Sequence, residues 1–600
     1  MSTPLPRWDL SNVYPGLESP EFTADVQRLV AQLDDLSALF DGRVAAASAA
    51  GSLPELADVV GELVGRFNRA MELADTLQSY VYGFTSTDSR DQVARRRLSE
   101  LQMVGVRLQT LFTRFRAWIG KLGPTLEEVI ALSPIAAAHA FPLREMAEQS
   151  KYLMSEAEEA LAAELSVSGA QAWSKLQHTL ISQLTVDFAV NGRSERMPLP
   201  ALINLRSHPD ADVRRRAYEA ELQVLDSVRE PLAACLNGVK GATITLERRR
   251  GRQDPLDKAL DQARIDRASL DAMLSAIEAA LPTFRRYLLA KAQRLGKERL
   301  AWWDLFAPIG QRDRTYTFDE AADFILENFA TFSPELAEMA QRAFQQRWID
   351  AEPREGKAAG AFCMGVDAVR ESRILCNFDG SMDQVFTLAH ELGHAFHNHC
   401  LYAAGKTPLQ SQTPMTLAET ASIMCETIVT EAALAQAASR HEELAILESA
   451  LIGQTQVIVD IYSRFLFERE VFRRRAQAEL SADDFDALML EAQRAAYGEA
   501  LDEAQLHRAM WTWKPHYYYA NLSFYNFPYA FGLLFGTGLY AIYRQRGAAF
   551  VPDYMALLAS TGEATAADLA ARFGIDVRSR RFWEDSLAVI GRRIERYCAL

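Results

Sequence analysis

The sequence predicts a mostly α-helical protein, and three observations support this. Residues 21–119 carry long amphipathic stretches rich in Leu, Ala, Glu and Arg, with apolar residues at helical spacing. Helix-start signals recur, since Thr317 with Glu320 forms a capping box and Ser333 precedes Pro334 at a first helical position. Strand candidates are few, namely residues 184–190, 361–366 and 373–377. We therefore expect long helices and only a small amount of β-sheet.

Domain boundaries are not marked in the sequence. The length of 600 residues would suggest about four domains. However, no long linker rich in Gly, Ser or Pro divides the chain, no charge block separates its parts, and no internal repeat stands out. We therefore expect one large, continuously packed body.

The most distinctive expected helix begins at Ser381 and ends near Gly405. Ser381 with Gln384 has the pattern of a capping box, and Gly405 lies where the helix would end. One face of this helix carries the apolar residues Val385, Leu388, Leu392 and Phe396. The roughly opposite side carries the histidines His390, His394 and His397. Such a helix packs on one side and lines a polar cavity on the other.

Two of these histidines enclose a glutamate in the order His390-Glu391-Leu392-Gly393-His394, which is typical of a zinc-dependent hydrolase. On a helix the spacing of four residues stacks both imidazoles on one face, with Glu391 beside the open coordination position. The motif should arise by chance in about one in a hundred chains of this length. The alternative, a helix that merely happens to carry histidines, is therefore disfavoured.

A catalytic zinc site needs a third protein ligand and one open position for water. Metzincins place a Gly and a third His where this chain has His397 and Cys400, which disfavours that class. Thermolysin-like enzymes use a Glu roughly twenty residues after the second His. Residues 412–415 hold no carboxylate, and the first acid downstream is Glu419. We therefore favour Glu419 as the third ligand.

Glu419 also has a second interpretation, because Thr416 with Glu419 forms a capping box that could account for the glutamate by itself. Glu426 lies two turns further along the same expected helix. We expect it to orient a zinc-bound imidazole rather than to bind the metal.

Further motifs extend over most of the chain. They are Trp8–Gly16, Leu295-Gly296 through Trp303–Leu305, Gly360–Phe362, Asn377–Ser381, Val385–His394, the pattern Glu-x-x-Ser-x-Met-x-Glu from Glu419, and Phe524–Tyr529. Together they resemble the thimet oligopeptidase and oligoendopeptidase F family of zinc endopeptidases, and most closely its oligoendopeptidase F branch. The long gap between His394 and Glu419 is what that family shows.

The resemblance implies a two-lobed helical body around a deep substrate channel, with a small β-sheet next to the zinc helix and one Zn²⁺ per chain. Residues 1–200 would form part of the channel wall, and residues 201–600 would carry the zinc site. An extended peptide would pair with an edge of the small sheet. The implied activity is hydrolysis of internal bonds in short unstructured peptides, with Glu391 as general base.

A tyrosine-rich stretch over residues 515–529 is expected to supply hydrogen-bond donors, because zinc alone only partly neutralises the oxyanion formed during peptide hydrolysis. The resemblance implies that His516, Tyr525 and Tyr529 contact substrate or stabilise the transition state. Which tyrosine takes the oxyanion is open, since the Gly-rich loop of the thimet branch is absent. About half of the aromatic side chains in the stretch are expected to belong to the core.

Residues 515–543 contain no Asp, Glu, Lys or Arg, and the segment is long enough to cross a bilayer. Its His, Asn, Ser and Pro residues and its glycines favour a buried loop and helix beside the active site instead.

The net charge and the cysteines limit the partners and the cellular compartment that can be expected. The net charge of −15 and the isoelectric point near 5.3 argue against nucleic acid and anionic membranes as partners. The six cysteines lack the spacing of a disulfide scaffold or zinc finger, which favours reduced thiols in the cytoplasm. No apolar signal core follows Met1. We expect oligopeptides as partners, no nucleic acid and no membrane, and leave the oligomeric state open.

Two other functions remain compatible with the sequence. A helical zinc carboxypeptidase would need a cationic pocket for the free carboxylate of its substrate. A noncatalytic peptide-binding protein could keep the metal fold, but Glu391 and both histidines argue against it.

Overall fold

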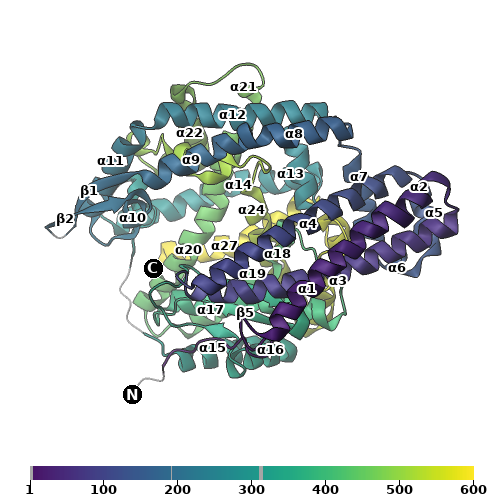
Figure 1. The fold of residues 1–600 in the computed structure, drawn as a ribbon. Coiled ribbons are helices and arrows are strands. Elements are labelled where there is room, and N and C mark those ends of the chain that lie inside the picture. The colour runs from purple at the N-terminus through teal and green to yellow at the C-terminus, as the bar shows by residue number, and fades with distance from the viewer. Residues whose placement is uncertain (1–3, 191, 310–314) are drawn as a thin grey trace. The chain divides into compact units, whose positions relative to one another are not determined.

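The computed structural model describes residues 4–190, 192–309 and 315–600, which are mostly helical (Figure 1). The expected mostly α-helical class is confirmed. Two compact units are present, each built from three separate segments of the chain. Unit 1 comprises Met1–Lys151, Arg314–Ala432 and Ile542–Gly574, and unit 2 comprises Tyr152–Asp313, Ala433–Ala541 and Ile575–Leu600. The roles expected for residues 1–200 and 201–600 stay predictions.

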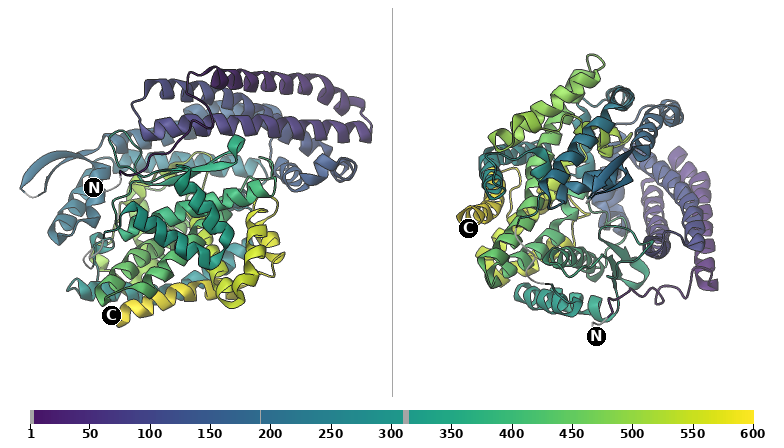
Figure 2. Two further views of the ribbon diagram at one scale, coloured as in Figure 1. Left: turned by 90° about the horizontal axis from the view of Figure 1, so that it is seen from below. Right: turned by 90° about the vertical axis from the view of Figure 1, so that its left-hand side faces the viewer.

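The first segment of unit 1 is a layer of helices. Its helices are α1 (Pro20–Leu39), α2 (Ala45–Ala50), α3 (Leu53–Thr87), α4 (Gln92–Leu122), α5 (Thr125–Leu132), α6 (Pro134–Ala138) and α7 (Ala140–Ser150). The long helices α1, α3 and α4 lie side by side in both views of Figure 2. Leu33, Leu63 and Phe115 are fully buried between them, and Phe67 stacks on Phe115 with ring centroids 5.0 Å apart. This apolar contact is the core of the layer.

The remaining segments of unit 1 contain the candidate site. Their elements are α15 (Phe318–Phe332), α16 (Pro334–Gln345), β3 (Ile349–Asp350), β4 (Phe362–Val366), β5 (Glu371–Leu375), α17 (Met382–Ala403), α18 (Met415–Ala418), α19 (Thr420–Gln436), α25 (Val551–Leu558) and α26 (Ala566–Ala571). Both expected helix starts are confirmed. Thr317 and Glu320 cap α15 reciprocally, and Ser333 caps α16 with Pro334 as its first residue.

The small sheet expected before the metal-binding helix is present and has the strand order β3-β5-β4. Strand β4 pairs antiparallel with β5, while β3 pairs parallel with β5. The sheet lies between α3 and α17, and its side chains alternate accordingly. Met364 approaches Gly83 of α3, whereas Gly365 approaches Tyr402 of α17. The strand order makes β4 an edge strand. One of its faces packs on α17, the helix that carries the histidine motif. The short strand β3 was not expected from the sequence.

Unit 2 is also helical. It contains α8 (Glu156–Ser168), α9 (Ala170–Gln183), β1 (Thr185–Val190), β2 (Arg193–Pro198), α10 (Leu199–Asn204), α11 (Ala211–Asp226), α12 (Arg229–Arg249), α13 (Pro255–Ala263), α14 (Arg267–Arg294), α20 (Arg440–Thr455), α21 (Ile461–Arg475), α22 (Ala482–Tyr497), α23 (Met510–Trp513), most of α24 (Phe527–Arg546) and α27 (Arg580–Ala599). The strand expected over residues 184–190 is β1, and it forms a hairpin with β2.

The uncharged segment 515–543 forms a loop and a helix, as expected, but the loop is only partly buried, since residues 519–522 are exposed or half-buried. A 3-10 turn (Pro515–Tyr518) leads to α24, whose residues from Ala530 to Tyr540 are buried. A different helical stretch, residues 440–475, is long and apolar enough to cross a membrane by length and composition alone. In its most apolar part, 56% of the residues are buried inside the protein.

Candidate metal centre

Helix α17 begins and ends close to the residues that the sequence indicated. The Ser381 side chain accepts a hydrogen bond from the Gln384 backbone N–H. The reciprocal half of the expected capping box is not formed, because Asp379 Oδ1 instead accepts hydrogen bonds from the Ser381 N–H and hydroxyl. Gly405 has φ of +65° just beyond the last turn, a conformation that favours glycine at a helix end. The helix is therefore fixed at both ends.

The two faces of α17 have the expected contrast. Its apolar face is fully buried through Val385, Leu388, Leu392 and Phe396. Its polar face lines a cavity of about 510 Å³. Residues lining this cavity include Cys363, Gly365, His390, Glu391, His394, His397, Asn398, Ser411, Thr413 and Glu419. The polar side chains converge there from β4, α17 and the segment that leads to α19.

Three expected ligands meet in this cavity. His390 Nε2 lies 3.2 Å and His394 Nε2 lies 3.5 Å from Glu419 Oε2. One donor atom from each of these residues lies within 4.8 Å of the other two. Each side chain remains about one quarter exposed to the cavity. The group can therefore surround a single metal ion and leave one side open.

The position of Glu419 excludes its second interpretation. Helix α18 begins at Met415 and ends at Ala418, and α19 begins at Thr420. Glu419 thus lies at the junction of two helices and is not the third residue of a helix capped by Thr416. Its carboxylate accepts a hydrogen bond of 2.7 Å from the Ser422 hydroxyl. The capping-box interpretation was therefore wrong, and the carboxylate is held facing the histidines.

Glu426 lies where an orienting residue is needed. Its Oε2 is 2.9 Å from His390 Nδ1, so Nε2 of the same ring is directed toward the cavity. Burial lowers the pKa of His390, but hydrogen bonds and charges from Glu419 and Glu426 outweigh it and raise the pKa to about 10. The same negative charge that retains a proton there favours a metal cation, which would displace that proton.

Glu391 is buried beside this group without being a part of it. Its side chain is 6% exposed, and its Oε2 has no hydrogen-bond partner within the described residues. Burial, together with the charges of Glu419 and Glu426, raises the pKa of this carboxyl to about 7 against the opposing effect of His390. An unpaired carboxylate that titrates near neutrality can accept and return a proton.

The donor set fits a divalent metal ion. Burial lowers the pKa of His394 to about 4, so its imidazole is neutral, as a metal ligand must be. Two imidazole nitrogens and one carboxylate oxygen form a set that zinc takes in hydrolases. Glu391 offers a further oxygen atom that no protein group satisfies within the described residues. The chemistry of the residues therefore agrees with the metal expected from the sequence.

Gly393, within the histidine motif, sets the distance between two helices. A Cβ atom at this position would lie 2.6 Å from the Ala421 carbonyl oxygen and 2.6 Å from Ser422 Cα. Helix α19 can therefore approach α17 only because residue 393 lacks a side chain. This contact brings Glu419 to the histidines.

A hydroxyl chain behind the metal centre was not indicated by the sequence. His397 Nε2 lies 2.9 Å from Thr561 Oγ1, which lies 2.7 Å from Thr413 Oγ1. The chain links α17 to the segment that precedes Glu419. Thr561 is distant in sequence, so only the folded unit brings it here.

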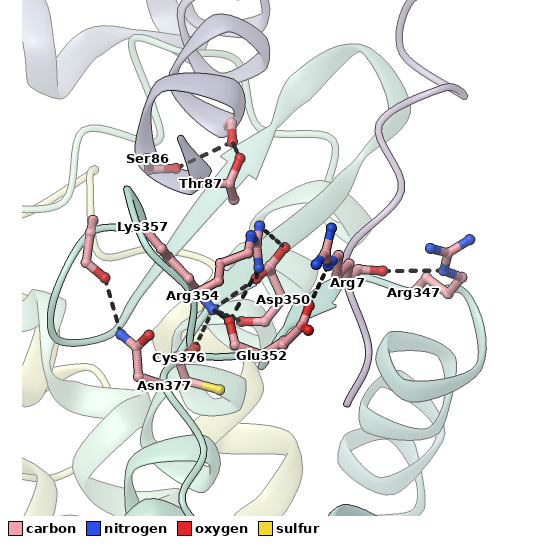
Figure 3. A network of polar contacts seen from close by, with 12 residues as sticks. Arg7, Ser86, Thr87, Arg347, Asp350, Glu352, Arg354, Lys357, Cys376 and Asn377 are labelled. Carbon is pink, nitrogen blue, oxygen red and sulfur yellow. Dashed lines mark hydrogen bonds and ion pairs between the residues drawn. The ribbon is translucent and has the colours of Figure 1, made fainter. Parts of the chain in front are cut away.

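The loop that leads into β4 is fixed by a buried charged cluster (Figure 3). Asp350 receives a bidentate pair of hydrogen bonds from Arg354 and an ion pair of 2.7 Å from Lys357. Lys357 Nζ also donates to the Cys376 carbonyl oxygen at 2.6 Å, next to the end of β5. Asn377 Nδ2 donates to carbonyl oxygens of the same loop. The cluster ties the start of edge strand β4 to the start of α17.

The expected donors of the tyrosine-rich stretch lie together in unit 2. The hydroxyl oxygens of Tyr525 and Tyr529 are 2.6 Å apart, and the Tyr525 ring stacks on the His516 ring with centroids 5.9 Å apart. Burial lowers the pKa of His516 to about 2, with help from the nearby cations Arg464 and Lys514. His516 is therefore neutral, and its Nε2 has no partner among the described residues.

Other members of the stretch have a structural role. Tyr517 and Tyr518 are fully buried in an apolar cluster of unit 2, which confirms that part of the stretch is core. Phe524 adopts φ of +53°, a conformation that costs about 1–3 kcal/mol in a residue other than glycine. Its ring packs against Phe465 and Phe472, and this contact holds the strained residue immediately before Tyr525.

Comparison with known proteins identifies the family. The model of the peptidase family M3 matches residues 204–589, and that of the oligopeptidase F family matches residues 124–185. The chain belongs to peptidase family M3. Oligoendopeptidase F of Lactococcus lactis subsp. cremoris is 25% identical over 65% of this chain and 64% of its own length. Oligopeptidase PepF of Bacillus subtilis is 22% identical over 95% of this chain and 84% of its own.

Solved structures show the same fold. A protein from Chlamydophila abortus matches with a TM-score of 0.83 at 19% identity, over 99% of this chain and 98% of its own. Oligoendopeptidase F from Enterococcus faecium matches with a TM-score of 0.70 at 17% identity, over 96% and 98%. The chain spans less than two thirds of the length of the first curated relatives that it matches. The M3 family and its fold are therefore established, and both agree with the resemblance found in the sequence.

Proposed function

We propose that the chain is a zinc-dependent oligoendopeptidase that hydrolyses internal bonds of short peptides. The observation that carries this proposal is the convergence of His390, His394 and Glu419 around one side of a cavity that also contains the unpaired carboxylate of Glu391. Membership of peptidase family M3 supports it.

His390, His394 and Glu419 would hold one zinc ion. When bound, the ion would supply a Lewis acid that polarises the scissile carbonyl and makes water acidic enough to react near neutral pH. Glu391 accepts the proton of the attacking water and later delivers it to the leaving amine. Its burial suits both steps, because a carboxyl with a pKa of about 7 exchanges its proton at neutral pH. Glu426 keeps the His390 imidazole oriented throughout.

Substrate binding follows from the position of β4. It is one of the two edge strands of its sheet and contributes Phe362, Cys363 and Gly365 to the lining of the cavity. An extended peptide that pairs with this edge would present its backbone carbonyl groups alongside α17. His516, Tyr525 and Tyr529 would contact the substrate and donate hydrogen bonds to the oxyanion.

The size limit on substrates rests on the channel that the family resemblance implies. A channel admits a single extended strand, and a folded protein would have to unfold to present one. Unfolding costs about 5–15 kcal/mol, so stable folded proteins would be left intact. A long disordered protein such as casein should be cut more slowly per bond than a peptide of about ten residues, and equal rates would indicate an open groove.

We also propose a cytoplasmic setting. All six cysteines are free, and burial raises the pKa of the Cys376 and Cys400 thiols to about 12, so these thiols are unreactive. The net charge of −15 does not favour nucleic acid or an anionic membrane as a partner.

One assay tests the proposal. An internally quenched peptide with a blocked carboxyl terminus should be cleaved by the zinc-loaded chain, and a chelator should abolish the cleavage. Added zinc should restore it. Cleavage only of peptides with a free carboxylate would indicate a carboxypeptidase instead. Binding without cleavage would indicate a noncatalytic protein.

A further inference from the structure

A small cavity in unit 2 has an unusual excess of positive charge. Its volume is about 30 Å³, and its lining includes the charged side chains Arg206, Asp460, Arg464 and Lys514 together with the polar side chains Tyr287, Thr455, Gln456 and Tyr497. A cavity needs roughly 10–15 Å³ of such volume to hold one water molecule. This cavity therefore has room for a monatomic ion together with a water molecule.

Two of the three cations in the cavity wall lack a counter-charge. Arg464, which is 7% exposed, forms an ion pair with Asp460. The Arg206 guanidinium lies 3.9 Å above the centre of the Phe306 ring, and Lys514 Nζ lies 4.0 Å above that of Trp513. Neither cation makes a hydrogen bond or ion pair to the described part of the chain. Because Asp460 balances only one charge, the wall carries an excess of positive charge.

Unpaired hydrogen-bond donors line the same cavity. Arg464 Nε and Trp513 Nε1 are buried and have no acceptor among the described residues. Buried N–H groups are rarely left without an acceptor, because water no longer solvates them. Asp460 Oδ1 is an unpaired acceptor nearby, which a water molecule in the cavity would satisfy. The cavity therefore needs an acceptor that is small and negatively charged.

The cations also repel one another. Burial, together with the charges of Arg464 and Arg206, lowers the pKa of Lys514 to about 7 against the opposing effect of Asp460 and Glu221. Burial likewise lowers the pKa of Arg206. Glu221 is the other carboxylate that acts on both residues, and it is already 2.8 Å from His507 Nε2. An anion between the cations would remove this repulsion.

We propose that this cavity is a binding site for a small inorganic anion with the size and charge of chloride, held by Arg206, Arg464 and Lys514 and by the indole N–H of Trp513. The proposal does not depend on the proposed peptidase function, although Arg464 and Lys514 also act on the pKa of His516. A carboxylate offers the same charge and acceptor atoms, but the small volume of the cavity favours a monatomic ion.

Bromide provides a direct probe because its anomalous scattering distinguishes it from water. Crystals of the full-length, zinc-loaded protein soaked in sodium bromide should show an anomalous peak inside the cavity. The peak should be absent from crystals of Lys514→Met, whose side chain has similar length and no charge. A wild-type cavity without an anomalous peak at saturating bromide, or an unchanged peak in Lys514→Met, would overturn the proposal.

Thermal unfolding in solution gives a second, independent readout. Replacing sodium gluconate by sodium bromide at constant ionic strength should raise the melting temperature by about 1 °C in a saturable manner, the shift expected by linkage for a chain of this size. Arg206→Met and Lys514→Met should lose the bromide-dependent shift, whereas Arg581→Met, at a side chain 87% exposed in the same unit, should retain it. Equal shifts in all variants would contradict a specific site.

The same experiment separates an anion site from a merely structural role of the cations. In gluconate, Lys514→Met should melt at or above the wild-type temperature, because the change removes repulsion between unbalanced charges. A lower melting temperature in gluconate, together with no bromide effect in the wild type, would show that Lys514 acts only through packing. Sodium formate added to the bromide soaks tests whether the site prefers a halide or a carboxylate. Displacement of bromide by formate would assign the site to carboxylates.

Discussion

The metal centre of unit 1 and the tyrosine cluster of unit 2 contrast in how they are built. In the metal centre, two histidines of α17 face the carboxylates of Glu419 and Glu426, and the three His–Glu contacts measure 2.9–3.5 Å. In the tyrosine cluster the groups are neutral: His516 has a pKa of about 2, and two tyrosine hydroxyls share one hydrogen bond. The first region therefore gathers carboxylates that suit a cation, and the second gathers neutral hydrogen-bond donors.

This difference predicts different consequences of mutation in the two regions. Changes in the metal centre should alter metal content or proton transfer, whereas changes in the tyrosine cluster should alter turnover while the metal remains bound. The following variants test that separation.

The largest effect is expected for Glu419→Ala. Loss of the carboxylate leaves only two imidazole ligands, fewer than a catalytic zinc site uses. Zinc content after dialysis, measured by atomic absorption, should fall to near zero, and peptidase activity should fall with it. His390→Ala and His394→Ala should behave in the same way. Normal zinc binding by Glu419→Ala would transfer the ligand role to Glu426.

Glu391→Gln should retain zinc and lose turnover. The amide keeps the shape of the side chain but cannot accept a proton, and loss of a general base lowers kcat by about 10²–10⁴-fold. Zinc content and melting temperature should match those of the wild type. If Glu391→Gln loses zinc as readily as Glu419→Ala, Glu391 is a ligand and the assignment of roles is wrong.

Tyr525→Phe and Tyr529→Phe each remove one hydroxyl with little change in packing. At least one of them should lower kcat by about a hundredfold with KM little altered, as expected for loss of one oxyanion donor. Tyr518→Phe is the matched control, because that hydroxyl is buried in the core and has no partner in the described structure. Full activity of both variants would leave His516 or Tyr519 as the donor.

Glu426→Gln should weaken zinc binding without abolishing it. The amide removes the negative charge beside His390 Nδ1, and loss of such an outer partner costs roughly 10–100-fold in metal affinity. Competition with a chromophoric chelator measures this directly. An affinity equal to that of the wild type would mean that the His390 ring is oriented by packing alone.

Gly393→Ala tests the approach of α19 to α17. The added methyl group would meet Ala421 and Ser422, and overpacking of this kind costs about 1–3 kcal/mol, so both stability in urea and zinc affinity should decrease. Gly453→Ala in α20 is the control, because nothing lies within 4 Å of its Cβ position. That substitution should increase stability by up to about 1 kcal/mol. Equal effects of the two would contradict a close contact at Gly393.

Much of the metal centre was predictable because it depends on local geometry. The spacing of His390 and His394 fixes both rings on one face of α17, and the buried face of that helix follows from its apolar residues. Helix caps at Thr317 and Ser333 were predictable for the same reason, since the bonding partners lie within three residues. Membership of the M3 family was also evident from motifs distributed along the chain.

Contacts between distant residues were decided only by the tertiary structure. The close approach that requires Gly393, the link from His397 to Thr561, and the cluster of Asp350, Arg354 and Lys357 all depend on which elements pack together. The role of Glu419 was ambiguous in the sequence, because a capping box and a metal ligand have the same local pattern. The break between α18 and α19 excludes the capping box and leaves the carboxylate facing the histidines, and the ligand role stays a prediction. The sequence by itself therefore determined the contacts within one helix, because the partners are a few residues apart. Contacts between helices were decided by tertiary packing, because their partners are distant in the sequence.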